Sequence, residues 1–284
     1  ALEERVLALL GAGPLDPKQL REGAGDAVRN LGPEGKKRGV TTTLPLVLGS
    51  LQSQGRIRRI PITGRLDQER YRYALWEPSP LTACGWSREE ALTELARRYF
   101  TWIGPATLGQ FQWFSGLGVR AAQAAVQPLG LRPVAPGSDW LLPPELEEPF
   151  RAYRRPEEPC YALVASLDGI FHLRRDVQSL LGSDLEGRLV PGEGALRPLG
   201  GLADLSSHAI LDRGELVGIW EFDPGEGRIL WQCFRGVCPA LPGAIARTEA
   251  FVREQLGDAR SYSMDTPASR EFSLSHLRAA MSAP

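Results

Sequence analysis

Positively charged side chains are concentrated between residues 36 and 72. This segment has nine Lys or Arg residues against only Asp67 and Glu69, so its net charge is +7 in a chain whose formal net charge is −1. Such a concentration is typical of proteins that bind a polyphosphate backbone electrostatically. We predict that duplex DNA contacts Lys36, Lys37, Arg38, Arg56, Arg58, Arg59, Arg65, Arg70 and Arg72. The alternative is a solvated, Arg-rich hairpin that has no ligand.

Three short helices are expected around this charge. Leu and Val at helical spacing predict the first helix over residues 2–10. Asp16 is a suitable N-cap for the second, because Pro17 fits the first helical position. The third has Thr43 as its predicted cap, carries Leu residues on one face, and ends at Gly55. Residues 36–38 are expected in the loop before it.

Two predicted strands follow the third helix, at residues 56–62 and 71–76. Three helices and a hairpin form a winged helix, a helix-turn-helix variant whose third helix enters the major groove while the hairpin contacts the DNA backbone. On that helix, Ser50, Gln52 and Ser53 are small or polar and are predicted to lie nearest the bases.

The same order of elements recurs over residues 88–142. Helices are predicted at 89–102, 108–114 and 119–129, followed by a short hairpin that ends at Leu142. Thr107 follows a Gly-Pro pair and one further residue, as Asp16 does 91 residues earlier, and both are capping side chains. This second copy is less basic, so we expect it to act mainly as a scaffold, with phosphate contacts from Arg120 and Gln123 as the alternative.

The remainder of the chain is rich in predicted strands, over residues 160–173 and 208–234. A short helix is expected at 174–181, a Gly-rich loop at 182–201, and two helices at 241–256 and 273–281. The predicted fold class is therefore α+β, with two tandem winged-helix units followed by a β-rich C-terminal domain with peripheral helices. The predicted domains are residues 1–80, 81–156 and 157–284.

Composition excludes several classes of protein. The chain has 284 residues, 43% of them hydrophobic, with no apolar run of the ~20 residues that a membrane span requires. Four scattered cysteines and the lack of a signal peptide favour the cytoplasm. Cys and His residues lack zinc spacing, so neither a metal site nor a cofactor is expected. The composition does not indicate an oligomeric state.

Three segments resemble the winged-helix DNA glycosylases of the AlkZ/YcaQ type. Residues 95–117 (LARRYFTWIGPATLGQFQWFSGL) are similar to that family's "RYL…GPAT…DF…WSGL" motif, and residues 163–181 to its "LLP.fD.lLl..rDR..ll" segment. Residues 208–220 are similar to its late hairpin "G.vLvdG.vvGtW". The resemblance implies tandem winged helices, a β-rich C-terminal domain, and excision of alkylated or cross-linked bases from duplex DNA.

The resemblance also guides the choice of catalytic candidates. The family's catalytic Gln-apolar-Gln or Gln-apolar-Asp lies in an N-terminal winged helix upstream of the two units predicted here, and we expect that unit to be missing from this chain. Gln110-Phe111-Gln112 matches the pattern literally but falls on a helix expected to be structural. Asp168 matches the family's "fD" aspartate, although Asp-Gly also signals a turn between strands.

Several residues near Asp168 have two readings. Arg174 and Arg175 are predicted to contact phosphate, with a surface ion pair to Asp176 as the alternative. Five aromatic side chains could stack on bases, but their spacing next to Leu and Ile predicts that they belong to the core: Trp102, Trp113, Phe114, Trp140 and Trp220.

Three functions stay open from the sequence. The first is a DNA repair glycosylase of the AlkZ type, in which base excision requires a buried polar group beside a cavity. The second is a DNA-binding protein without catalytic activity, such as a transcriptional regulator or a nucleoid-associated factor. The third is a protein-interaction scaffold, because winged helices also serve that purpose.

Overall fold

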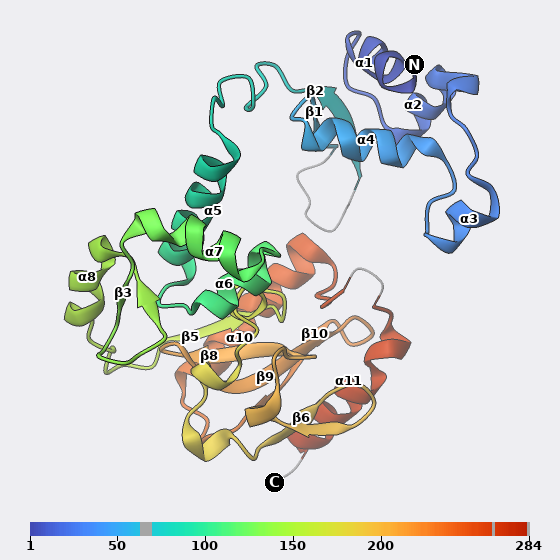
Figure 1. Ribbon diagram of the computed structural model, residues 1–284. Coiled ribbons are helices and arrows are strands. Elements are labelled where there is room, and N and C mark those ends of the chain that lie inside the picture. The colour runs from blue at the N-terminus through green and yellow to red at the C-terminus, as the bar shows by residue number, and fades with distance from the viewer. Residues whose placement is uncertain (63–69, 263–264, 283–284) are drawn as a thin grey trace. The chain divides into compact units, whose positions relative to one another are not determined.

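A computed structural model describes residues 1–62, 70–262 and 265–282. The chain divides into two compact units, Ala1–Trp86 and Ser87–Pro284, which we call unit 1 and unit 2 (Figure 1). Each unit has its own hydrophobic core.

Unit 1 consists of four helices and an antiparallel hairpin. They are α1 (Leu2–Leu10), α2 (Pro17–Ala24), α3 (Gly32–Lys37), α4 (Thr43–Ser53), β1 (Ile57–Pro61) and β2 (Tyr71–Leu75). The Leu face of α4 packs on α1 and on the inner face of the hairpin. The three predicted helices and the hairpin are confirmed, whereas the winged-helix assignment stays a prediction.

Two local predictions in unit 1 are wrong. Residues 36 and 37 lie in α3 rather than in a loop, because Asn30 accepts a hydrogen bond from the Gly32 N–H (2.8 Å) and a proline follows at the helix start. Thr43 does not cap α4: the N-cap is Thr42, and the Thr43 hydroxyl accepts from the Arg29 N–H instead (3.1 Å). The Asp16 cap is confirmed, with a full capping box to Gln19.

Unit 2 begins with a helical segment. It contains α5 (Arg88–Ile103), α6 (Leu108–Ser115), α7 (Val119–Val126), β3 (Arg132–Pro133), β4 (Leu141–Leu142) and α8 (Glu147–Ala152). Capping boxes start α5 at Ser87 and α6 at Thr107, the latter as the sequence predicts. Tyr99, Phe100 and Phe111 fill the core of this segment and lie edge-on or tilted against one another.

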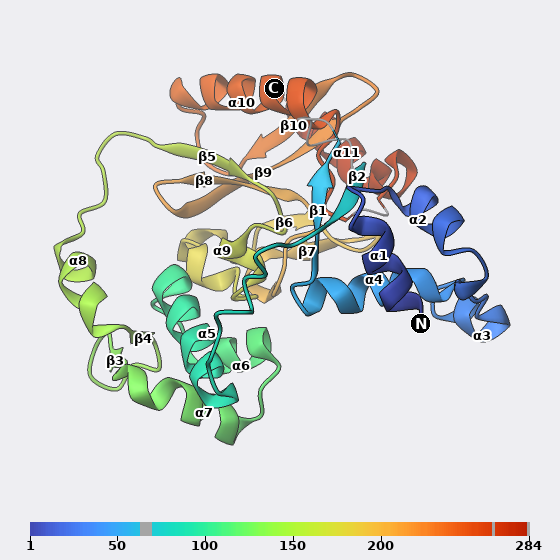
Figure 2. The same cartoon turned by 90° about the horizontal axis from the view of Figure 1, so that it is seen from above.

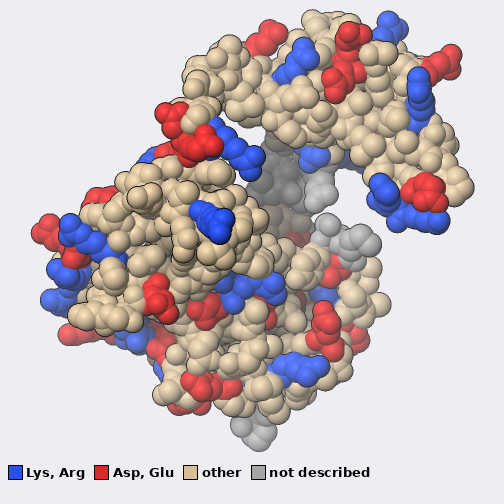
Figure 3. Space-filling model, in the orientation of Figure 1, with Lys and Arg blue, Asp and Glu red and all other residues tan. Residues whose placement is uncertain are grey.

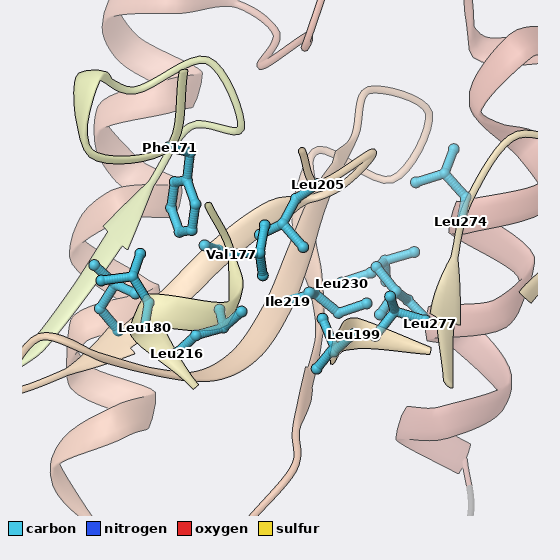
Figure 4. Close-up of a cluster of buried hydrophobic side chains, with 13 residues drawn as sticks. Phe171, Val177, Leu180, Leu199, Leu205, Leu216, Ile219, Leu230, Leu274 and Leu277 are labelled. Carbon is cyan, nitrogen blue, oxygen red and sulfur yellow. The ribbon is translucent and has the colours of Figure 1, made fainter. Parts of the chain in front are cut away.

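A four-stranded antiparallel sheet in the order β10-β9-β8-β5 forms the centre of the remainder of unit 2. Its strands are β5 (Tyr161–Val164), β8 (His208–Asp212), β9 (Glu215–Asp223) and β10 (Arg228–Cys233). One face packs against α10 (Ala240–Phe251), as Figure 2 shows from above. The other face packs against α11 (Pro267–Ser282) and α9 (Gly169–His172) through the cluster in Figure 4, which includes Phe171, Ile219 and Leu277.

The predictions for residues 160–201 are only partly right. The strand ends at Val164, and residues 169–172 form α9. The expected helix at 174–181 is reduced to a 3-10 turn at Gln178–Leu180. The expected Gly-rich loop contains a second hairpin, β6 (Leu189–Pro191) and β7 (Leu196–Pro198), because buried Val190 and Leu199 anchor it to the core of the sheet.

Short turns complete the secondary structure. Further 3-10 turns lie at Gly25–Ala27, Gln127–Leu129, Pro144–Leu146, Ser183–Leu185 and Leu199–Gly201, and a π-helical turn at Val252–Leu256 extends α10. With this turn, α10 covers the predicted range 241–256, and α11 is longer than the predicted range 273–281. Among the described residues no helix is long and apolar enough to cross a membrane. The division into three domains stays a prediction.

Candidate DNA interface and catalytic residues

The β1–β2 hairpin presents two arginines on its outer face. Arg58 pairs with Ala74 and Arg72 pairs with Ile60 across the hairpin, so the two side chains share one face, opposite to buried Ile57 and Tyr73. Both are exposed, and neither forms an ion pair with any residue that the structure describes. Unpaired guanidinium groups on a regular strand surface are available to phosphate oxygens.

Arg59 lies on the inner face of the hairpin, at the middle of β1 and opposite Tyr73. Its guanidinium stacks over the ring of Tyr71, 4.2 Å from the ring centroid, and lies 5.9 Å from that of Tyr73. Burial raises the pKa of the Tyr73 hydroxyl, so this ring stays neutral and helps to fix the stack. The contact leaves Arg59 exposed but holds its plane in one orientation.

The other predicted basic contacts differ in their surroundings. Lys36 and Arg38 at the end of α3 are exposed, whereas Lys37 pairs with Glu34 (2.7 Å). Basic side chains gather with an acidic one over the α3 end of unit 1 in Figure 3. Arg56 and Arg70 flank the hairpin and are exposed. Arg65 lies outside the described residues.

The predicted base-reading residues of α4 are bonded within the protein. Ser50 donates to Glu3 (3.4 Å) and accepts from Gln54 (3.0 Å). Gln52 donates to the Leu48 carbonyl and Ser53 to the Gly49 carbonyl. A contact with a base would replace these bonds, each of which contributes about 1 kcal/mol net. Their role at DNA therefore stays a prediction.

Gln110 has a structural role in α6. Its side-chain oxygen accepts from the Thr107 N–H (2.8 Å) and its nitrogen donates to Asp176 (3.2 Å), so both ends of the amide are engaged. Phe111 is fully buried in the core. Gln112 is partly exposed, and its side chain makes no hydrogen bond to a described residue. Of this literal Gln-apolar-Gln match, only Gln112 has a free amide.

Asp168 caps α9. Its side chain accepts from the Ile170 N–H (3.0 Å), as N-cap residues do, and it is exposed. The expected turn between two strands is therefore a turn between β5 and a short helix. An exposed carboxylate at this position lacks the enclosure that base excision needs.

Arg174 connects the two segments of unit 2. Its guanidinium donates to the Ile103 carbonyl at the end of α5 and lies 5.9 Å from the centroid of the Trp140 ring. Burial lowers its pKa, and its Nε has no hydrogen-bond partner among the described residues. Tyr99 on α5 adds a second tie to the same stretch by donating to the Leu173 carbonyl (2.9 Å). Arg174 therefore contributes to packing, and its predicted contact with phosphate stays a prediction.

Arg175 is held in an unusual conformation. Its φ is 53°, in the left-handed region that non-glycine residues seldom occupy. Its ion pair is with Asp204 (2.6 Å) and not with Asp176, the alternative partner that the sequence suggested. The guanidinium also lies 5.2 Å from the centroid of the Trp113 ring, and His172 approaches that ring edge-on.

The prediction that the tryptophans and Phe114 belong to the core is wrong for two of them. Trp102 is 70% exposed and Trp113 44% exposed, because each lies on the outer face of its helix while neighbouring Phe and Tyr residues fill the interior. Phe114 and Trp220 belong to cores, and Trp140 is partly buried. Trp113, with Arg175 and His172 around it, is an accessible aromatic platform.

Sequence reasoning missed a buried carboxylate on β9. Glu221 is 1% exposed and lines a cavity of about 580 Å³. Burial raises the pKa of this carboxyl from 4.5 to about 7. Nearby His208 has its pKa lowered by burial from 6.5 to about 4, and its Nδ1 accepts from the Ser166 N–H (3.0 Å), so the ring is neutral at pH 7. An ionisable residue within the apolar run Leu216–Phe222 was the available signal.

Comparisons with known proteins agree on one family. A family model described as DNA glycosylase AlkZ-like matches residues 1–260. The solved structure of Streptomyces sahachiroi DNA glycosylase AlkZ is similar to this one, with a TM-score of 0.55 and 18% sequence identity over 91% of this chain and 67% of that chain. At this identity the likeness shows the fold alone. No match was found among curated proteins. Because the family model covers most of the sequence, the chain belongs to the AlkZ-like DNA glycosylase family.

Proposed function

We propose that this protein binds duplex DNA through winged helices, with the β1–β2 hairpin of unit 1 as the principal contact, and acts in DNA repair as an AlkZ-like glycosylase on alkylated or cross-linked bases. The observation that carries the proposal is the outer face of the hairpin, where Arg58 and Arg72 are exposed and unpaired among the described residues. Family membership supports the class of reaction.

The division of charge between the units supports the same surface. Unit 1 has 13 Lys and Arg residues against 9 Asp and Glu, a net charge of +4, and unit 2 has 20 against 25, a net charge of −5. Many arginines of unit 2 are neutralised in ion pairs, such as Arg235 with Asp184 and Glu215. Phosphate therefore gains most from contact with unit 1.

Duplex affinity tests the interface. The double variant Arg58→Ala/Arg72→Ala should weaken binding and reduce the slope of log K against log salt by roughly 2, because about 0.9 counterions are retained for each lost phosphate contact. The matched control is Arg151→Ala/Arg253→Ala, which removes two exposed arginines of unit 2 that are ion-paired within their own helices. Equal slopes of log K against log salt for the two double variants would show that Arg58 and Arg72 do not contact the DNA backbone.

Release of a damaged base tests the chemistry, and the candidate residues can be separated. Asp168→Asn keeps a capping side chain but removes the charge, whereas Asp168→Gly weakens the cap only slightly and removes the carboxylate altogether. Loss of excision in both, with duplex affinity retained, would assign Asp168 to catalysis. Gln112→Ala tests the free amide of α6, and Gln110→Ala tests the amide that is bonded on both sides.

A non-catalytic DNA-binding protein is the second candidate. It is favoured by the structural roles of two predicted catalytic groups, since Gln110 is bonded at both ends and Asp168 caps α9. Salt-sensitive duplex binding without release of any base from alkylated or cross-linked DNA would select this function over the glycosylase.

A further inference from the structure

A groove of about 480 Å³ lies at the open end of the β1–β2 hairpin of unit 1. Its walls come from Leu7 on α1, Arg56 before β1, Leu75 at the end of β2, and the segment that follows β2. This volume lies in the range of small-ligand sites. We call it the Trp76 groove, and all the described residues that line it belong to unit 1.

Arg56 and Trp76 lie opposite each other at the edge of the groove. The Trp76 N–H donates to the Arg56 carbonyl (2.9 Å), which adds one pair to the ladder after Ile57 and Leu75. Because side chains alternate along a strand, both project from the outer face of the hairpin. Arg56 is exposed and forms no ion pair with a described residue, and Trp76 is 37% exposed. Arginine and tryptophan are enriched among the residues that dominate binding at protein interfaces.

The floor and rim of the Trp76 groove are apolar. Leu7 and Leu75 line it and are only partly buried against the core of unit 1. Leu81 is 49% exposed and packs on Gly55, where a Cβ would lie 3.0 Å from the Leu81 Cγ. Leu81 therefore extends the apolar surface beside Arg56. Exposed apolar surface with polar groups at its rim is typical of docking sites for other proteins.

Charge restricts what can occupy the groove. Among the described lining residues, Arg56 and Glu77 are the charged ones, so the lining has no net charge. A polyphosphate backbone gains little from such a surface, whereas one carboxylate can pair with the Arg56 guanidinium through two hydrogen bonds. Arg58 lies two residues along the same face of β1, or ~7 Å away, and offers a second cation to a longer ligand.

We propose that the Trp76 groove binds the C-terminus of a partner protein that ends in a large apolar residue and has an acidic residue two positions before it. The last residue of a chain carries its carboxylate and its side chain on one carbon, so the carboxylate can pair with Arg56 while the side chain lies on Leu7 and Leu75. In an extended peptide the side chain two positions earlier points to the same side, ~7 Å away, which matches the spacing to Arg58. The interaction goes beyond the proposed function and does not depend on base excision.

A labelled peptide tests the proposal. The full chain is titrated against Ser-Gly-Asp-Leu-Phe, labelled with fluorescein at its N-terminus, and binding is followed by fluorescence anisotropy. The C-terminal amide of this peptide should bind at least about 10-fold more weakly, because a charge-assisted hydrogen bond is lost. Replacing the terminal Phe by Gly should have an effect of similar size, because the apolar contact is lost. Equal affinity for the acid and the amide would overturn the proposal.

Variants of the groove are compared with matched controls. Arg56→Gln and Trp76→Ala should each reduce peptide affinity at least about 10-fold. Arg21→Gln on α2 and Leu46→Ala on α4 remove an exposed arginine and an exposed apolar side chain elsewhere in unit 1, and they should leave it unchanged. Circular dichroism melts show whether each variant is folded, and Arg56→Gln decides the outcome if Trp76→Ala is destabilised, because it alters only an exposed side chain. Unchanged affinity in Arg56→Gln, or no saturable binding up to about 1 mM peptide, would overturn the proposal.

DNA is the competing occupant of the groove, and the two proposals fail separately. Duplex affinity that falls in Trp76→Ala, in a protein that does not bind the peptide, would assign the groove to the DNA interface and reject the peptide site. Salt-sensitive duplex binding without peptide binding would likewise leave the proposed function standing alone. Peptide binding that depends on Arg56 and on the free carboxylate, in a protein that neither binds duplex DNA nor releases a base, would support the peptide site and reject the proposed function.

Discussion

At the scale of single residues, two buried ionisable groups of unit 2 act in opposite directions with pH. Glu221 holds its proton more tightly in the folded state, with a pKa raised from 4.5 to about 7, so its stabilising contribution is present below pH 4.5 and is lost as the pH rises through 7. His208 binds its proton less tightly when folded, with a pKa lowered from 6.5 to about 4, so its contribution is present above pH 6.5 and is lost as the pH falls through 4.

In the wild type the pH dependences that Glu221 and His208 give to the free energy of unfolding nearly cancel. A substitution of either residue should therefore reveal the pH dependence of the other. Between pH 5 and pH 8 the free energy of unfolding of unit 2 should rise by about 2 kcal/mol in Glu221→Gln, since only the His208 effect remains, and should fall by about 2–3 kcal/mol in His208→Gln. Urea unfolding at the two pH values measures both. Parallel pH profiles for wild type and both variants would show that neither group titrates as its burial implies.

At the scale of elements, the start of α6, the helix that carries Gln110 and Gln112, depends on a capping box. Thr107 and Gln110 each accept from the backbone N–H of the other, and Gln110 also bonds to Asp176 beyond the helix. The start of α6 therefore fixes both the helix and one contact between the segments of unit 2. This arrangement gives a structural reason for a glutamine three residues after the cap.

Removing the hydroxyl tests this role. Thr107→Ala should lower the free energy of unfolding by about 1 kcal/mol, whereas Thr107→Ser should retain nearly all of it, because serine keeps the capping oxygen. Chemical denaturation followed by tryptophan fluorescence reports the difference, since Trp113 lies on α6. Equal free energies of unfolding for Thr107→Ala and Thr107→Ser would show that the capping oxygen does not stabilise the protein.

At the scale of the whole molecule, the two units differ in net charge and each has its own hydrophobic core. Unit 1 is basic and closes its own core around α1, α4 and the hairpin, while unit 2 is acidic and carries its own clusters on both faces of the sheet. This separation of charge is consistent with the proposed contact between unit 1 and a phosphate backbone.

Core truncations should therefore act on one unit at a time. Leu20→Ala removes a fully buried side chain of unit 1 and should destabilise that unit by about 2–5 kcal/mol, with a loss of duplex affinity. Leu230→Ala should destabilise unit 2 by a similar amount. Differential scanning calorimetry would resolve the two effects, and a single transition shifted equally by both variants would contradict independent cores.

The sequence by itself determined the elements whose signals are local. Helical spacing of Leu, the caps at Asp16 and Thr107, and the alternation of β1 and β2 each depend on neighbours a few residues away, so α1, α2, α4, the basic hairpin and the helices of residues 88–129 could be predicted. The family resemblance was also carried by local motifs, and the family match confirms it.

Only the tertiary structure decided the surroundings of the side chains. The conversion of residues 182–201 into a hairpin depends on burial of Val190 and Leu199 against strands far away in the sequence. The exposure of Trp102 and Trp113, the partners of Gln110 and Arg175, and the enclosure of Glu221 follow from the same long-range packing. Spacing in the sequence reports which face of an element a residue occupies, whereas its dielectric surroundings and partners are set by what packs on that face.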